Sequence, residues 1–129
     1  MEKRKLLIIE PDVFERDVFS KVFSDLYEIK FTINVNEATE TIKEYQPSAL
    51  IYDMPLTDMG SFRKLNEANS HNGNSIPLIL IVSDNSLEFE RMARENKVFY
   101  YLIKPFDFKE LSEAIHSATC FAIKNNLAI

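Results

Sequence analysis

The sequence predicts an α/β fold, a doubly wound parallel sheet in which strands and helices alternate along the chain. Short apolar runs recur at intervals, as buried strands do. The segments between them carry apolar residues three and four positions apart, which is the spacing of a helix with one buried face. The first, third and fourth runs are almost wholly apolar, as expected of parallel strands that helices cover on both faces.

Five apolar runs are predicted to form the strands. They are residues 6–9, 27–33, 49–52, 78–82 and 98–103. The second run differs from the others, because Ile29, Phe31 and Ile33 alternate with polar residues. This alternation is typical of a strand with one exposed side and predicts that the second strand lies at an edge of the sheet.

The first helix has the clearest pattern, with two adjoining apolar stripes. One stripe contains Phe14, Val18 and Val22, and the other contains Phe19, Phe23 and Leu26. Two helix starts are marked by an aspartate followed three residues later by a glutamate. These pairs are Asp12 with Glu15 and Asp107 with Glu110, and the spacing favours a side chain that caps the first amide groups. A third helix is predicted around residues 61–69.

Composition narrows the classes of protein that the chain can belong to. Its 129 residues, 46% of them apolar, suit one domain over residues 1–129. The net charge of −5, without a basic arm, argues against direct nucleic-acid binding. With Cys120 as the sole cysteine no intrachain disulfide forms, and the apolar run 6–9 is too short to cross a membrane. We therefore expect a cytoplasmic protein with no membrane association.

Polar side chains stand at the carboxyl ends of four predicted strands. Glu10 follows the first, Asp53 the third, Ser83 the fourth and Lys104 the fifth. In open parallel sheets, ligands bind at this edge. Neighbouring carboxylates there favour a hard divalent cation and the Lys104 ammonium as balancing charges. Such a site suits phosphoryl chemistry, with Asp53 as nucleophile and the Ser83 hydroxyl as a hydrogen-bond donor.

These residues resemble the receiver domains of two-component response regulators over essentially the whole chain. The resemblance lies in four ordered segments, LLIIEPD, ALIYDMPLTDM, PLILIVSDN and YYLIKPF. It implies a flavodoxin-like sheet of five parallel strands in the order 2-1-3-4-5, with five flanking helices. It also implies a signalling module that is not an enzyme.

The resemblance assigns a role to each strand-end residue. It implies that Asp53 is the phosphoacceptor, that Lys104 contacts the phosphoryl group, and that Ser83 and Tyr101 move when the group arrives. Mg²⁺ is the implied cofactor, held by Glu10, Asp53, the Pro55 backbone carbonyl and, as a further candidate, Asp12. The peptide bond between Lys104 and Pro105 is commonly cis in this family.

The implied partners are a histidine kinase or a phosphotransfer protein as phosphoryl donor. The output is a downstream protein, or self-association, through the face formed by the fourth helix, fifth strand and fifth helix. Neither the cognate kinase nor the output partner follows from the sequence.

The chain departs from the family pattern in three places. Pro11 stands where the family has a second acid that binds the metal, and Asp12 either substitutes for it or caps the following helix. Thr57 replaces the usual proline after the phosphoacceptor, and Asp84 adds a carboxylate beside the pocket. A second hypothesis follows from these departures, a pseudo-receiver that is not phosphorylated and binds a protein constitutively.

Overall fold

The computed structural model describes residues 2–55, 58–70, 75–83 and 86–125. Strands and helices alternate from β1 to α5. In chain order they are β1 (Arg4–Ile9), α1 (Val13–Phe23), β2 (Tyr27–Thr32), α2 (Val35–Tyr45), β3 (Ala49–Asp53), α3 (Met59–Asn69), β4 (Leu78–Val82), α4 (Leu87–Glu95), β5 (Tyr100–Ile103) and α5 (Phe108–Lys124).

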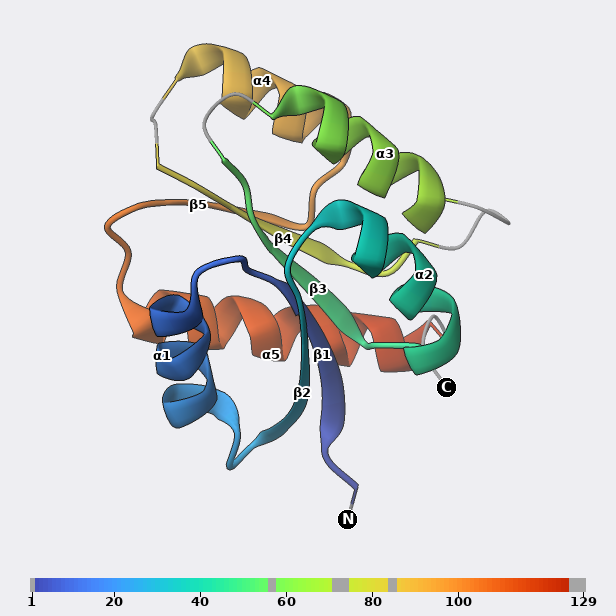
Figure 1. Ribbon diagram of the computed structural model, residues 1–129, viewed down its shortest axis with the longest axis vertical. Helices are drawn as coiled ribbons and strands as arrows, with labels where there is room; N and C mark the ends of the chain where they lie inside the picture. The colour runs from blue at the N-terminus through green and yellow to red at the C-terminus, as the bar shows by residue number, and fades with distance from the viewer. Residues whose placement is uncertain (1, 56–57, 71–74, 84–85, 126–129) are drawn as a thin grey trace.

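The sheet has five parallel strands in the order β2-β1-β3-β4-β5, which confirms the predicted fold class. β2 lies at one edge, as its alternating pattern predicted. The strand order reverses between β1 and β3. The connections that follow these two strands therefore leave the carboxyl edge in opposite directions. Figure 1 shows the strands at the centre of the ribbon with the helices around them.

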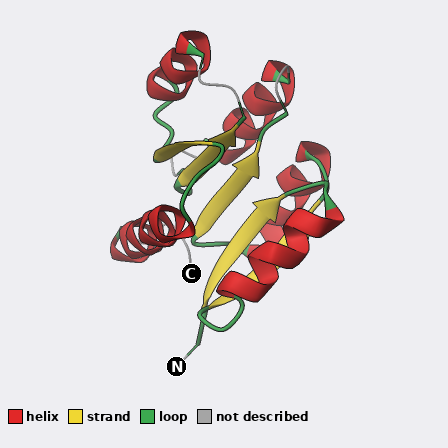
Figure 2. Ribbon diagram, turned by 90° about the vertical axis from the view of Figure 1, so that its left-hand side faces the viewer, coloured by secondary structure: helices red, strands yellow, loops and turns green. Residues whose placement is uncertain are grey.

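The sheet separates two apolar cores, because successive strand residues point to opposite faces. On one face, Leu7, Leu50 and Leu80 pack with α2, α3 and α4. On the other face, Ile8 and Ile51 pack with α1 and α5. The three layers are visible in Figure 2, where helices lie on both sides of the strands. Burial on both faces explains why the central strands are nearly continuous in apolar residues.

The fifth strand begins later than predicted. Its apolar run starts at residue 98, but β5 starts at Tyr100. The Val98 amide donates to the Ala93 carbonyl and so closes the end of α4 instead of joining the sheet. Lys97, just before it, has a positive φ of 56°, a turn conformation that the apolar pattern does not reveal.

Aspartates cap the helices where the spacing predicted. Asp12 Oδ1 accepts hydrogen bonds from the Phe14 and Glu15 amides at 2.8 and 3.3 Å, at the start of α1. Asp107 caps α5 through the Lys109 amide at 2.9 Å. The third helix begins at Met59, two residues before the predicted start, because Asp58 caps it through the Ser61 amide. These caps fix where each helix leaves the carboxyl edge of the sheet.

None of the helices within the described ranges is both long enough and apolar enough to span a membrane.

The cap at Asp12 gives a first testable prediction. Asp12→Ala should lower the free energy of unfolding by about 0.5–2 kcal/mol, because two amides at the start of α1 lose their acceptor. Asp12→Asn should leave the free energy of unfolding almost unchanged, since asparagine caps as well as aspartate does. Urea unfolding of the two variants measures the difference. Equal losses in both would contradict the capping role.

Candidate functional site

An ion pair joins the ends of β3 and β5. Lys104 Nζ lies 2.8 Å from Asp53 Oδ2, although 51 residues separate them in the chain. β4 lies between the two strands, with Asp53 paired to Ile81 and the Lys104 amide donating to the Val82 carbonyl. The Asp53 side chain is 12% exposed and that of Lys104 is 34% exposed. The sheet therefore brings a carboxylate and an ammonium together at a rim that solvent can reach.

Glu10 adds a buried carboxyl beside this pair. It follows β1, is 2% exposed, and its Oε2 accepts a hydrogen bond from the Asp12 amide at 3.3 Å. Its Oε1 is buried and, within the described part of the chain, receives no hydrogen bond. Burial, a hydrogen-bond contribution from Asp53 and repulsion by the Asp53 charge raise the pKa of Glu10 to about 8. In the absence of a further cation, the protonated form of Glu10 is therefore favoured in this site.

Lys104 remains a cation in this environment. Burial lowers its pKa, but the hydrogen bond to Asp53 and attraction to Asp53, Glu10 and Glu15 outweigh burial and raise the pKa above its ordinary value. Glu15 is a residue of the site that the sequence assigned only to helix capping. Its place in the first turn of α1, directly after a strand that ends at the rim, is the signal that could have indicated it.

The remaining predicted metal ligands already make hydrogen bonds. Asp12 Oδ1 accepts the two α1 amides, so this oxygen serves the cap. The Pro55 carbonyl accepts the Asp58 amide at 3.2 Å, and a carbonyl oxygen has a second lone pair for another partner. Pro11, in the position of the missing acid, is exposed.

The two predicted switch residues lie at different depths. Ser83 directly follows β4 and is exposed, and no hydrogen bond joins it to Asp53 or Lys104 in the described structure. Tyr101 lies in β5, half-buried, and packs against the core that faces α2, α3 and α4. The peptide bond between Lys104 and Pro105 is cis, as the resemblance implied. Thr57 and Asp84 lie outside the described residues.

The donor set can be compared with the needs of Mg²⁺. Over the described ranges, no three histidine, cysteine, aspartate or glutamate side chains gather closely enough to hold a metal ion by themselves. Mg²⁺, however, is commonly held by one or two carboxylates, keeping several waters. Glu10 and Asp53 supply two carboxylates, and the repulsion between their charges, which helps to raise the pKa of Glu10, favours a cation beside them. With the Pro55 carbonyl, these residues fit a weakly held Mg²⁺.

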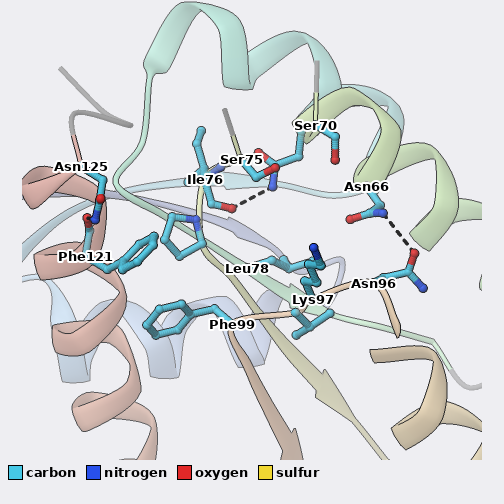
Figure 3. Close-up of a pocket in the computed structure, with 13 residues that line it drawn as sticks. Asn66, Ser70, Ser75, Ile76, Leu78, Asn96, Lys97, Phe99, Phe121 and Asn125 are labelled. Carbon is cyan, nitrogen blue, oxygen red and sulfur yellow. Dashed lines mark hydrogen bonds between the residues drawn. The ribbon is translucent and has the colours of Figure 1, made fainter. Parts of the chain in front are cut away.

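A cavity of about 540 Å³ lies at the opposite edge of the sheet. Figure 3 shows it at the amino ends of β4 and β5, beside Leu78 and Phe99. Among the residues that line it, Phe99 and Phe121 have ring centroids 5.7 Å apart, and the Asn66 side chain donates a hydrogen bond to Asn96. Because Asp53 and Lys104 stand at the carboxyl ends of the strands, this cavity is separate from the ion-pair site.

Comparisons with known proteins identify the family of the chain. The family model of the response regulator receiver domain matches residues 6–116. The probable C4-dicarboxylate response regulator DctR of Priestia megaterium is 25% identical over 122 residues, which cover 92% of this chain and 53% of that protein. The regulatory protein AtoC of Escherichia coli K12 is 26% identical over 115 residues, covering 88% and 25%. The chain thus spans about half of DctR and a quarter of AtoC.

Solved structures share the fold. A CheY-like receiver domain protein from Methanospirillum hungatei superposes with a TM-score of 0.82 at 20% identity, covering 96% of this chain and 99% of that chain. The receiver domain of a putative LuxO repressor from Vibrio parahaemolyticus gives 0.84 at 18% identity, covering 97% and 96%. With the family match spanning most of the sequence, the chain belongs to the response regulator receiver domain family.

Proposed function

We propose that the protein is a phosphorylation-responsive receiver in which Asp53 accepts a phosphoryl group from a histidine kinase or a phosphotransfer protein. The observation that carries the proposal is the Asp53–Lys104 pair at 2.8 Å, with Glu10 buried beside it. Family membership supports it, since receiver domains are in general signalling modules of two-component systems and not enzymes.

The proposed reaction moves one phosphoryl group. An oxygen of Asp53 attacks the phosphorus of phosphohistidine, the P–N bond breaks, and an acyl phosphate forms on Asp53 while the imidazole leaves. Lys104, already beside the carboxylate, balances the negative charge that the phosphoryl oxygens bring. The Ser83 hydroxyl follows the adjacent strand and is proposed to donate to one of these oxygens.

Receiver domains typically bind Mg²⁺ at the phosphorylation site, and we assign this role to Glu10, Asp53 and the Pro55 carbonyl. Bound Mg²⁺ neutralises negative charge on carboxylate and phosphoryl oxygens. Asp12 remains a further candidate through its second carboxylate oxygen. Because Pro11 replaces an acidic ligand, we expect the ion to be held weakly.

The proposed output is a change at the face formed by α4, β5 and α5. The acyl phosphate on Asp53 carries about 1.5 to 2 negative charges in place of the single charge of the carboxylate, and it draws Ser83 and Lys104 inward. Tyr101 lies in β5, which Lys104 directly follows, so it is placed to transmit this movement. A downstream protein or a second copy of the chain would read the altered face.

A second candidate function is a pseudo-receiver that keeps the fold and binds its partner constitutively. Pro11 favours it, because the site then lacks one of the acids that hold the metal in the family. Asp84 and the altered loop after Asp53 favour it too, since an added carboxylate beside the pocket would repel an incoming phosphoryl group. Phosphorylation in solution distinguishes the two functions.

The hypothesis that Asp53 is phosphorylated predicts covalent modification of one aspartate. Incubation with acetyl phosphate and Mg²⁺ should add the mass of one phosphoryl group, measured by intact mass spectrometry. The Asp53→Asn variant should gain no mass, because its side-chain amide is not a nucleophile. The matched control Asp107→Asn, which preserves the α5 cap, should be modified like wild type. A wild-type protein that gains no mass would refute the phosphorylation hypothesis.

The raised pKa of Glu10 predicts a pH-dependent stability in the absence of metal. The unfolded chain loses the Glu10 proton near the ordinary pKa of 4.5, whereas the folded chain keeps it to about 8. Between these values the folded state binds more protons, so stability falls as pH rises. Urea unfolding in EDTA from pH 5 to 8 should show wild type losing stability relative to Glu10→Gln. The control Glu40→Gln should follow wild type; parallel profiles for Glu10→Gln and wild type would refute this prediction.

A further inference from the structure

The cavity at the amino edge of the sheet lies where three helices end. Ser70, Asn96 and Asn125 are the C-cap residues of α3, α4 and α5, and all three line it. The last carbonyl groups of a helix lack partners within that helix, and its dipole gives this end about half a negative charge. Three helix ends at one cavity therefore favour a positively charged ligand. The volume of about 540 Å³ is typical of a site for a small organic molecule.

Hydrogen bonds occupy the amide nitrogens of the four asparagines that line the cavity. Their acceptors are Asn96 Oδ1 for Asn66, the Ile76 carbonyl for Asn69, the Met92 carbonyl for Asn96 and the Phe121 carbonyl for Asn125. The Met92 carbonyl can only accept, so Asn96 presents its oxygen to Asn66, and Asn66 must donate. This leaves the Asn66 oxygen without a donor among the described residues. Figure 3 shows it turned away from Asn96, toward the middle of the cavity.

Two phenyl rings form an apolar wall of the same cavity. Phe99 and Phe121 have ring centroids 5.7 Å apart and planes tilted by 52°, and Phe121 is 46% exposed. Pro77 and Leu78 continue this wall. Figure 3 shows the two rings on the side away from Asn66. A ligand ring packed on this wall gains apolar burial and an aromatic contact, while a polar group at the other end of the ligand reaches the Asn66 oxygen.

Lys97 is the one ionisable side chain among the described residues that line the cavity. It is exposed and forms no ion pair with a described residue, so its ammonium is free to extend into solvent. A bound cation therefore meets only screened repulsion from Lys97. The same part of the lining contains no carboxylate, the ligand on which Ca²⁺ and Mg²⁺ sites usually depend. These features favour an organic cation over a metal ion.

We propose that the cavity binds a small aromatic amine in its ammonium form. The aromatic ring packs against Phe99 and Phe121, and the ammonium donates a hydrogen bond to the Asn66 oxygen. The charge on the ammonium makes this hydrogen bond stronger than one from a neutral donor. The proposal is independent of phosphorylation, because Asp53 and Lys104 stand at the opposite edge of the sheet.

Three probes of similar shape test the sign of the charge. At neutral pH phenethylamine is a cation, phenethyl alcohol is uncharged and hydrocinnamate is an anion. In NMR titrations, phenethylamine should shift the backbone amides near residues 66, 96, 99 and 121 and reach saturation. Phenethyl alcohol should bind about ten-fold more weakly, since it lacks the charge, and hydrocinnamate more weakly still. Hydrocinnamate binding as tightly as the amine, or an amine that does not saturate these signals, would overturn the proposal.

Substitutions in the lining test the proposed contacts. Asn66→Leu removes the acceptor and Phe121→Ala removes part of the aromatic wall, and each should weaken phenethylamine binding by about ten-fold. Lys97→Gln should strengthen binding several-fold, because the repulsion is removed. The matched control Leu87→Ala, at an exposed position at the start of α4, should bind the amine like wild type. Far-UV circular dichroism checks that each variant is folded.

The variants also define the results that contradict the assignment. Unchanged affinity in folded Asn66→Leu and Phe121→Ala would place the amine outside this cavity, and loss of binding in Lys97→Gln would contradict a site for cations. The alternative occupant is the segment of residues 126–129, which follows Asn125 in the chain. If its deletion shifts the lining amides while wild type does not respond to phenethylamine, the cavity belongs to that segment and the proposal fails.

Discussion

The Asp53–Lys104 ion pair depends on a constraint that the sheet imposes. All five strands run the same way, so every strand delivers its last side chain to one edge. Asp53 and Lys104 come from strands that are separated by β4, yet their charged atoms are 2.8 Å apart. The apolar cores on the two sheet faces hold the strands in register and thereby keep these side chains together. A shift of register by one residue would turn Asp53 away from the rim.

The same edge explains the electrostatics of Glu10. Two carboxyls and one ammonium leave a net negative charge in a partly buried place, and the pKa of Glu10 rises because burial disfavours a second charged carboxylate. A proton relieves this charge in the absence of other ligands. A divalent cation relieves it too, and leaves Asp53 available to a phosphoryl donor. Protonation of Glu10 and binding of the proposed metal ion are therefore two ways of reducing the same negative charge.

Sequence patterns predicted the architecture because burial on both faces of a parallel sheet makes continuous apolar runs, and helix caps have a short local signature. The edge position of β2 and the caps at Asp12 and Asp107 followed from such local patterns. The late start of β5 did not, since it depends on Lys97 adopting a positive φ and on the Val98 amide binding back to α4. The spacing of apolar residues indicates neither of these features.

The sequence predicted which side chains stand at the carboxyl edge of the sheet, but not how they interact there. Parallel topology placed Glu10, Asp53, Ser83 and Lys104 at one edge. The engagement of the Pro55 carbonyl with Asp58 and the proximity of Glu15 to Lys104 required coordinates, because both depend on how loops and helices leave the sheet. The two apolar stripes of α1 were visible in the sequence. Which stripe faces solvent depends on the direction in which the helix packs.

The central claim is that one rim assembles a pocket able to hold a phosphoryl group. Beryllofluoride, a mimic of that group, tests it when added with Mg²⁺ while backbone amide signals are followed by NMR. We expect the shifts to cluster around residues 10, 53, 83 and 104 and to spread into β5. An absence of shifts at these positions, or shifts that persist unchanged in Asp53→Asn, would contradict the account.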